Sequence, residues 1–282
     1  MINQLSSRIS DRLNRQPKLK KFRFFMIAFI LSNLGLIVGQ AVPDFFPGKN
    51  NPWNTITSYV TMAALYLFLI IRLQLKTLKL FRLPYFDWRT WVALAVAVFL
   101  ATQRINLHNL SNQSLGAIAT GAVFILAIGL GEEVVSRGFV YGIFETMGKK
   151  FALFFSSLLF GLLHLSWYIG AYWDPWAAYW HVFNAFAAGF FLCSFMLATQ
   201  SIWPSVLMHA AWDWRLGFNS NSVKLPQPGH ITHSEFWSGL ISPLWNNFPL
   251  LFLSIWFLFL RYWKTPRNFE NLLLKFKLIE PN

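Results

Sequence analysis

The chain has 282 residues, of which 55% are hydrophobic and only 12% are charged, and its formal net charge is +13. Soluble domains carry about 25% charged residues, so this composition excludes an ordinary soluble protein and indicates a polytopic membrane protein. A strongly basic chain can also bind nucleic acid. Here, however, the basic residues lie in short segments between apolar runs, a pattern typical of membrane topology, so no nucleic-acid partner is expected.

Eight apolar segments approach the ~20 residues that an α-helix needs to cross a bilayer. In chain order they are Phe24–Val42, Trp53–Ile71, Trp88–Thr102, Ala117–Phe144, Phe151–Gly170, Trp176–Ala198, Ile202–Trp214 and Leu240–Leu260. The fourth is too long for one simple span, which indicates a tilt or an extension beyond the bilayer. The third and seventh are short, and seven spans result if the seventh is re-entrant. We therefore expect an all-α polytopic transmembrane helix bundle of about eight spans.

The distribution of Lys and Arg predicts which side of the membrane each end occupies. Of the 24 such residues, 20 fall on the side of both termini in an eight-span arrangement, and four fall on the opposite side. Those four are Lys49, Arg104, Arg215 and Lys224. Because cytoplasmic loops are rich in Lys and Arg, both termini are expected in the cytoplasm. The long basic lead and the length of the first apolar run favour a retained span over a cleaved signal peptide.

We divide the chain into four parts. Residues 1–23 form a basic cytoplasmic tail, and residues 24–116 hold the first three spans. Residues 117–214 hold the four spans that contain the candidate functional residues discussed below, and residues 215–282 hold a polar loop, the last span and a basic cytoplasmic tail. This compact organisation is typical of a multi-pass protein of the bacterial plasma membrane. The lipid bilayer is therefore an expected partner of the protein.

Charged residues inside the fourth apolar segment are the first candidates for chemistry. An ionised side chain in hydrocarbon costs roughly 2.5–3.5 kcal/mol, so such groups usually face the protein interior and have a function. Glu133 and Arg137 are four residues apart and share one helix face, with the acid first as a favourable pair requires. Glu132 lies about 100° round the helix and faces a different partner. Two adjacent glutamates can therefore serve as one structural anion and one base.

Two further apolar segments supply imidazole and carboxylate groups. His164 lies within one of them, and His209 and Asp213 lie four residues apart on another, where a carboxylate can orient an imidazole. Glu, His, His and Asp on three helices are the ligand types of a zinc-like site or of an acid–base site that activates water. His181 is expected to form a hydrogen bond with a neighbouring helix. Cys193, the only cysteine, is expected to be a small packing residue.

Three motifs on three of the apolar segments carry a family resemblance. They are Glu132-Glu133-x-x-x-Arg137, Phe160-x-x-x-His164 and His209-x-x-x-Asp213. In this order they resemble the CPBP family of intramembrane metalloproteases, also called the Abi or CAAX-protease family. The resemblance covers roughly residues 117–214. The chain departs from the family pattern where Phe186 and Gly189 are followed by Cys193 in place of a second glycine, a change that concerns helix packing.

The resemblance implies an intramembrane endopeptidase that cleaves a peptide or a membrane-protein substrate. Glu132 would be the catalytic glutamate, and His164 its partner in positioning a water. Glu133 and Arg137 would support that geometry, while His209 and Asp213 would complete the site and stabilise the oxyanion. A divalent metal such as zinc, held by His164 and His209, is compatible with these residues, and so is water activated without a tightly bound metal.

Two other functions are compatible with a buried polar site. A non-proteolytic scaffold or chaperone could keep the same fold and bind partner proteins in its cavity. A transporter would also explain buried charges, but the sequence has no inverted repeat. The presence of every core motif residue favours the peptidase.

Overall fold

Helices account for all the regular structure that the computed structural model describes. The described residues are 51–111, 113–165, 175–218 and 233–262, together with Met26 and Ile30, and the side chains of residues 109, 175–177 and 233–240 are not part of this set. Within these ranges the chain contains helices and no strand. The expected all-α class is confirmed for this part of the chain.

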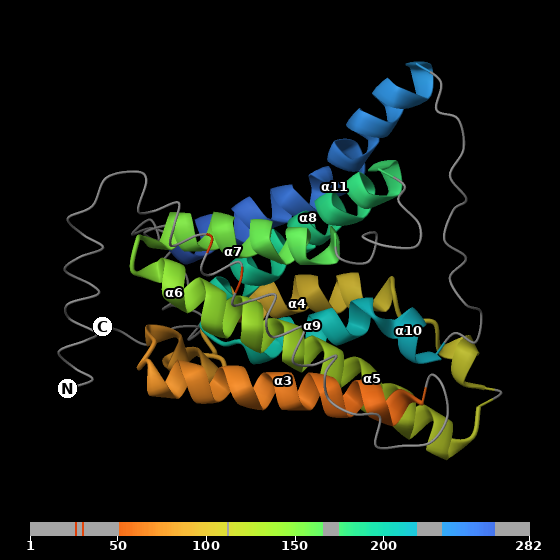
Figure 1. The fold of residues 1–282 in the computed structure, drawn as a ribbon, viewed down its shortest axis with the longest axis horizontal. Helices are drawn as coiled ribbons and strands as arrows, with labels where there is room; N and C mark the ends of the chain where they lie inside the picture. The colour runs from red at the N-terminus through yellow and green to blue at the C-terminus, as the bar shows by residue number, and fades with distance from the viewer. Residues whose placement is uncertain are drawn as a thin grey trace, which may run out of the picture.

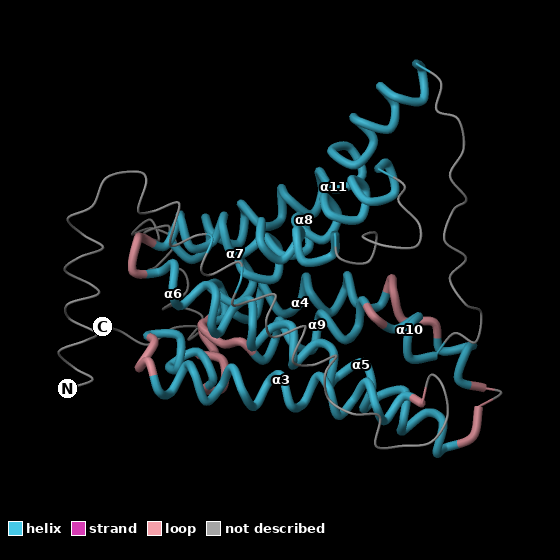
Figure 2. Tube along the Cα trace, in the orientation of Figure 1, coloured by secondary structure: helices cyan, strands magenta, loops and turns pink. Residues whose placement is uncertain are grey.

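The helices run mainly along the long axis of the molecule (Figures 1 and 2). Their bounds are α3 (Pro52–Arg72), η1 (Lys76–Phe81), α4 (Trp88–Thr102), η2 (Leu107–Leu110), α5 (Leu115–Glu133), η3 (Val134–Val140), α6 (Tyr141–Glu145), α7 (Lys149–Leu163), α8 (Pro175–Thr199), α9 (Trp203–Trp212), α10 (Trp214–Phe218) and α11 (His233–Tyr262). Helix α8 is central, because it packs against α4, α7, α9 and α11. Helices α3 and α5 lie together on the opposite side of α9.

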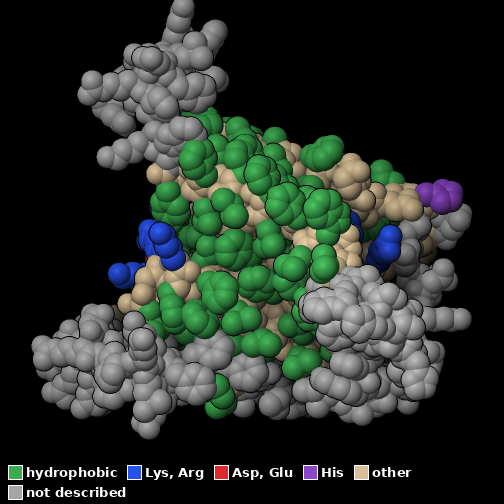
Figure 3. Space-filling model, turned by 90° about the horizontal axis from the view of Figure 1, so that it is seen from above, with side chains coloured by type: hydrophobic (Ala, Val, Ile, Leu, Met, Phe, Trp, Pro, Cys, Tyr) green, Lys and Arg blue, Asp and Glu red, His purple; other side chains and the backbone are tan. Residues whose placement is uncertain are grey.

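Four of the expected spans are long and apolar enough to cross a membrane. They are Pro52–Arg72, Leu115–Glu145, Ala178–Thr199 and Ile241–Tyr262. Apolar side chains cover much of the face seen in Figure 3, with Lys and Arg near its two ends. Large hydrophobic residues such as Phe68, Phe252 and Ile255 are exposed on these helices, as a lipid-facing surface requires. The chain is therefore an integral membrane protein.

The count of eight spans and the placement of both termini in the cytoplasm remain predictions. Helices α4, α7 and α9 have 15, 15 and 10 residues, which is shorter than the ~20 that a complete span needs. The expected first span falls almost entirely outside the described residues, as do both tails and most of the polar loop after α10. The expected fifth span also continues past the described part of α7.

The long fourth segment is a single helical run of 31 residues, and one stretch within it is π-helical. At 1.5 Å per residue such a run is roughly 45 Å long, which exceeds the ~30 Å hydrocarbon core. The stretch, η3, contains Arg137 and is fully buried. Its altered hydrogen bonding frees backbone groups, and the Thr77 hydroxyl donates to the Gly138 carbonyl at 2.6 Å. Wide turns of this kind are common at functional sites.

A glycine sets the distance between α5 and α9. A Cβ atom built on Gly129 would lie 2.9 Å from the Val206 carbonyl oxygen and 3.3 Å from the Ala210 nitrogen. Backbone atoms cannot move aside as a side chain can, so the two helices approach this closely because residue 129 has no side chain. The close approach brings the end of α5, with both glutamates, against His209.

Changing Gly129 to Ala should therefore push α5 away from α9. We expect a loss of about 1–3 kcal/mol in the free energy of unfolding, as for other overpacked cores. Thermal unfolding of the purified chain in detergent measures the change. Gly116→Ala on the same helix is the matched control, because no atom lies within 4 Å of its added Cβ. Equal stability of the two variants would contradict the close-packing argument.

Candidate active site

The predicted pair of Glu133 and Arg137 forms inside the bundle. Arg137 Nη1 lies 3.0 Å from Glu133 Oε1, and the two side chains are 1% and 0% exposed. A charge this deeply buried is costly unless it is paired and hydrogen-bonded. Arg137 Nη2 also donates to the Gly189 carbonyl at 2.9 Å, and the guanidinium carbon lies 4.5 Å from the centre of the Phe160 ring. Arg137 therefore ties η3 to α7 and α8 as well as neutralising Glu133.

Glu133 has a second role that the sequence did not reveal. Its Oε1 atom accepts a hydrogen bond from His209 Nδ1 at 2.9 Å. Because a carboxylate can only accept, this contact places a proton on Nδ1 and fixes the orientation of the ring. The sequence predicts that Asp213 orients His209. In the structure Asp213 instead faces the other ring nitrogen, with its Oδ2 atom 3.6 Å from His209 Nε2.

Glu132 points to a different partner from Glu133, as the 100° turn between adjacent helical residues requires. Its Oε1 atom accepts a hydrogen bond from the Tyr59 hydroxyl at 3.2 Å, and its Oε2 atom lies 3.7 Å from His209 Nε2. The Glu132 side chain is 17% exposed, whereas that of Glu133 is fully buried. The two neighbouring carboxylates thus differ in partner and in access, and Glu132 is the accessible one.

His209 Nε2 is the point where these groups converge. Glu132 and Asp213 approach it at 3.7 and 3.6 Å, which is beyond direct hydrogen-bond distance but close enough for both carboxylates to act on this atom electrostatically. The opposite side of the ring is held by Glu133. A small polar molecule next to Nε2 would therefore have carboxylate oxygens on two sides.

His164 reaches the same region from α7. It is the C-cap residue of that helix, and its Nδ1 atom lies 2.8 Å from the Phe160 carbonyl oxygen. That contact requires a proton on Nδ1 and leaves Nε2 as the ring's other polar atom. The Phe160 ring lies between the two histidines, with its centre 5.0 Å from that of His164 and 5.8 Å from that of His209.

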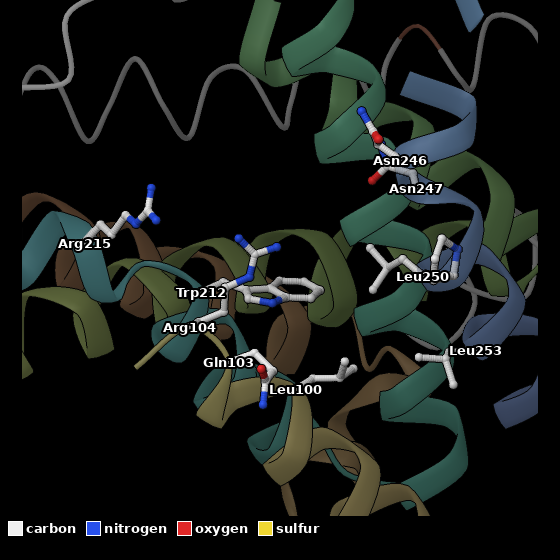
Figure 4. A pocket seen from close by; sticks show the side chains of 10 residues that line it. Leu100, Gln103, Arg104, Trp212, Arg215, Asn246, Asn247, Leu250 and Leu253 are labelled. Carbon is white, nitrogen blue, oxygen red and sulfur yellow. The ribbon is translucent and has the colours of Figure 1, made fainter. Parts of the chain in front are cut away.

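A cavity of about 550 Å³ connects these side chains with the end of α4 and the middle of α11. Its lining comprises Arg104, Phe160, His164, Trp180, His181, Asn184, Ala185, Ala188, Leu192, His209, Trp212, Asp213, Asn246, Asn247 and Leu250. An adjoining pocket of about 370 Å³ shares Arg104, Trp212, Asn246, Asn247 and Leu250 with it. Figure 4 shows this second pocket, with Trp212 and Arg104 on one side and Asn247 and Leu250 on the other.

The structure brings all six predicted site residues together and adds others. Of the six, His164, His209 and Asp213 line the cavity, while Glu132, Glu133 and Arg137 lie against or behind His209. Tyr59, Arg104 and Asn247 were missed. Their residue types occur throughout membrane helices and their segments are distant in sequence, so no sequence signal distinguished them.

Helix α8 contributes an asparagine and a histidine to the cavity lining. Asn184 accepts a hydrogen bond from the Asn247 amide of α11. His181 lies beside His164, with ring centres 4.9 Å apart, and both line the cavity. Cys193 is fully buried, 3.9 Å from the Ser156 hydroxyl, which agrees with a packing role.

Among the described residues, no three His, Cys, Asp or Glu side chains are placed to share one ion. His164 Nδ1 and His209 Nδ1 are both engaged, so their Nε2 atoms are the ring nitrogens that could bind a metal.

The fold and the site together define an integral membrane protein that holds a cluster of carboxylate and imidazole side chains beside a cavity. Residues 113–215 match a family model described as type II CAAX prenyl endopeptidase Rce1-like. The match includes all six predicted site residues and confirms the resemblance to the CPBP family of CAAX proteases. Because this is a protease family, the match supports a peptidase. No curated protein and no solved structure matched the chain.

Proposed function

We propose that the chain is an intramembrane endopeptidase of the CAAX-protease type, acting on a membrane-associated or peptide substrate in a bacterial plasma membrane. The observation that carries the proposal is the convergence on His209 Nε2. Two carboxylates, Glu132 and Asp213, approach this atom, and Glu133 accepts a hydrogen bond from the other ring nitrogen. Of these residues, His209 and Asp213 line the cavity. The family match supports the same reading.

Glu132 is the proposed general base. A water between Glu132 and His209 Nε2 would give its proton to the carboxylate as its oxygen attacks the scissile carbonyl carbon. His164, from the facing side of the cavity, would help to hold that water. After the tetrahedral intermediate forms, Glu132 would return the proton to the leaving amine, so that each turnover restores the starting state.

His209 is the proposed oxyanion stabiliser. In the protonated ring both nitrogens donate, with Nδ1 directed to Glu133 and Nε2 available to the developing negative oxygen. Three carboxylates lie within 3.7 Å of that ring and favour its positively charged form. Because the donor is fixed before the reaction, little reorganisation is needed when the charge develops.

Trapping of intact substrates tests this function. Glu132→Gln keeps the shape of the side chain but cannot accept the water proton, so uncleaved substrates should remain bound and be identified by mass spectrometry after purification. The parent chain should yield their cleaved products instead. If both chains retain the same intact proteins, the alternative of a non-proteolytic scaffold is favoured.

Tyr59 should position the base rather than take part in bond cleavage. Tyr59→Phe removes the hydrogen bond to Glu132, and bonds to charged groups contribute about 1.5–3 kcal/mol, so we expect kcat to fall roughly 10- to 100-fold with little change in KM. Kinetics on an identified substrate measure both constants. Tyr85→Phe, an exposed tyrosine away from the site, is the control. An unchanged kcat in Tyr59→Phe would remove Tyr59 from the mechanism.

A divalent ion such as zinc is a separate prediction from the family resemblance. His164 and His209 are the side chains that would hold it, and when bound it would polarise the scissile carbonyl. Metal analysis of the purified chain tests the prediction. A resident ion should be present in near-equal amount to the protein and be lost in both His164→Ala and His209→Ala, but not in Glu145→Gln.

A further inference from the structure

The two ends of the bundle differ sharply in charge. One end of the bundle holds the end of α3, η1, the starts of α4 and α7, and the end of α11 (Figure 1). In or next to these elements the sequence has eight cations: Arg72, Lys76, Lys79, Arg82, Arg89, Lys149, Lys150 and Arg261. Contacts between segments confirm that they lie together: Arg261 is 3.7 Å from Asp87 at the start of α4, and Lys149 lies over the Tyr262 ring at the end of α11. The Ser201 hydroxyl bonds the Arg82 carbonyl at the same end. We call this group of eight cations the basic end.

The opposite end has only two cations among the described residues. Arg104 follows α4, and Arg215 lies in α10. The indole nitrogen of Trp214 donates to the Asn106 carbonyl at 3.3 Å, which joins α10 to the segment after α4. Helix α4 separates this end from the basic end by 15 residues, or about 22 Å. Because Lys and Arg are enriched in cytoplasmic segments, we expect the basic end to lie on the cytoplasmic side.

The cavity reaches the surface at the end with two cations. Its exposed lining residues are Arg104 and Asn246, whereas His209 at its base is buried. The adjoining pocket extends this path to Gln103 and Arg215, both exposed (Figure 4). His164 ends α7, the helix that begins at Lys149 in the basic end, so it lies a full helix length away from the cytoplasmic side.

We propose that the catalytic cavity opens on the non-cytoplasmic side of the membrane and accepts a peptide segment presented there. The proposal rests on the proposed peptidase function and specifies its substrate class: a membrane-anchored or exported chain whose scissile bond is exposed outside the cytoplasm. A lipid-modified C-terminus displayed in the cytoplasm would meet the basic end instead and would not reach His209.

Labelling of single cysteines tests the orientation without any assay of activity. Gln103→Cys places a thiol at the mouth of the cavity, and Lys79→Cys places one at the basic end, where the side chain is exposed. The parent chain is the control, because its one cysteine, Cys193, is fully buried. A membrane-impermeant maleimide should label Gln103→Cys in intact spheroplasts and Lys79→Cys only after permeabilisation. The reverse pattern, or labelling of both in intact spheroplasts, would overturn the proposal.

A second measurement tests the route taken by the substrate. A bulky impermeant maleimide on Gln103→Cys should block cleavage of a trapped and identified substrate, while the same group on Lys79→Cys in permeabilised vesicles should leave cleavage unchanged. Blocking at residue 79 alone would also overturn the proposal. If the parent chain cleaves nothing, the peptidase function fails, and the labelling pattern still decides on which side the cavity opens.

Discussion

Changing Glu132 to Gln should lower the rate of proteolysis by about 10²- to 10⁴-fold, the contribution that a general base usually makes. The substitution keeps the hydrogen bond from Tyr59 and the size of the side chain, but an amide cannot take a proton from water. Because the ion pair of Glu133 with Arg137 is untouched, the variant should unfold at nearly the parent's temperature. Rates on a reconstituted substrate and thermal unfolding in detergent measure the two effects.

Glu145→Gln is the matched control for this experiment. It removes the same charge from the same continuous helical run but lies at the basic end, away from His209. We expect its rate to equal that of the parent. Full activity of Glu132→Gln would refute the proposed role of Glu132, and equal loss in both variants would trace the effect to net charge rather than to the base.

The sequence predicted the site better than it predicted the arrangement around the site. Glu133 and Arg137 were paired correctly because helical spacing alone determines which residues share a face. The link between Glu133 and His209 was not predictable, because it depends on how closely α5 approaches α9, and that distance is set by Gly129. A glycine in an apolar run gives no sign of which helix packs against it.

The same limit explains the missed residues. Tyr59 comes from α3, a helix outside the three motifs, and its hydroxyl becomes relevant only when α3 packs against α5. The long fourth segment was recognised as unusual from its length. Its π-helical stretch was not, because hydrogen bonding within the helix, and not the apolar pattern, distinguishes it. The periodicity of the sequence therefore predicted which residues share a helix face. Which side chains that face contacts depends on how the helices pack.

Breaking the buried ion pair should have the largest effect on stability. Arg137→Met removes the guanidinium that pairs with the fully buried Glu133 carboxylate, and loss of one partner of such a pair costs about 3–5 kcal/mol. The variant also loses the bond to the Gly189 carbonyl that ties η3 to α8. Thermal and denaturant unfolding in detergent measure the change. Arg72→Met, an exposed cation at the end of α3, is the control, and its effect should stay within about 0.5 kcal/mol.

A double variant separates the structural role of the pair from its catalytic role. In Glu133→Gln/Arg137→Met neither buried charge remains, so most of the lost stability should return, because replacing a whole buried pair is often nearly neutral. Activity should stay about 10- to 100-fold below the parent, since a neutral amide still accepts from His209 Nδ1 but no longer balances the charge of the ring. If stability does not recover, the hydrogen bond to Gly189 rather than the ion pair holds η3 in place. If activity recovers with stability, Glu133 acts only in folding.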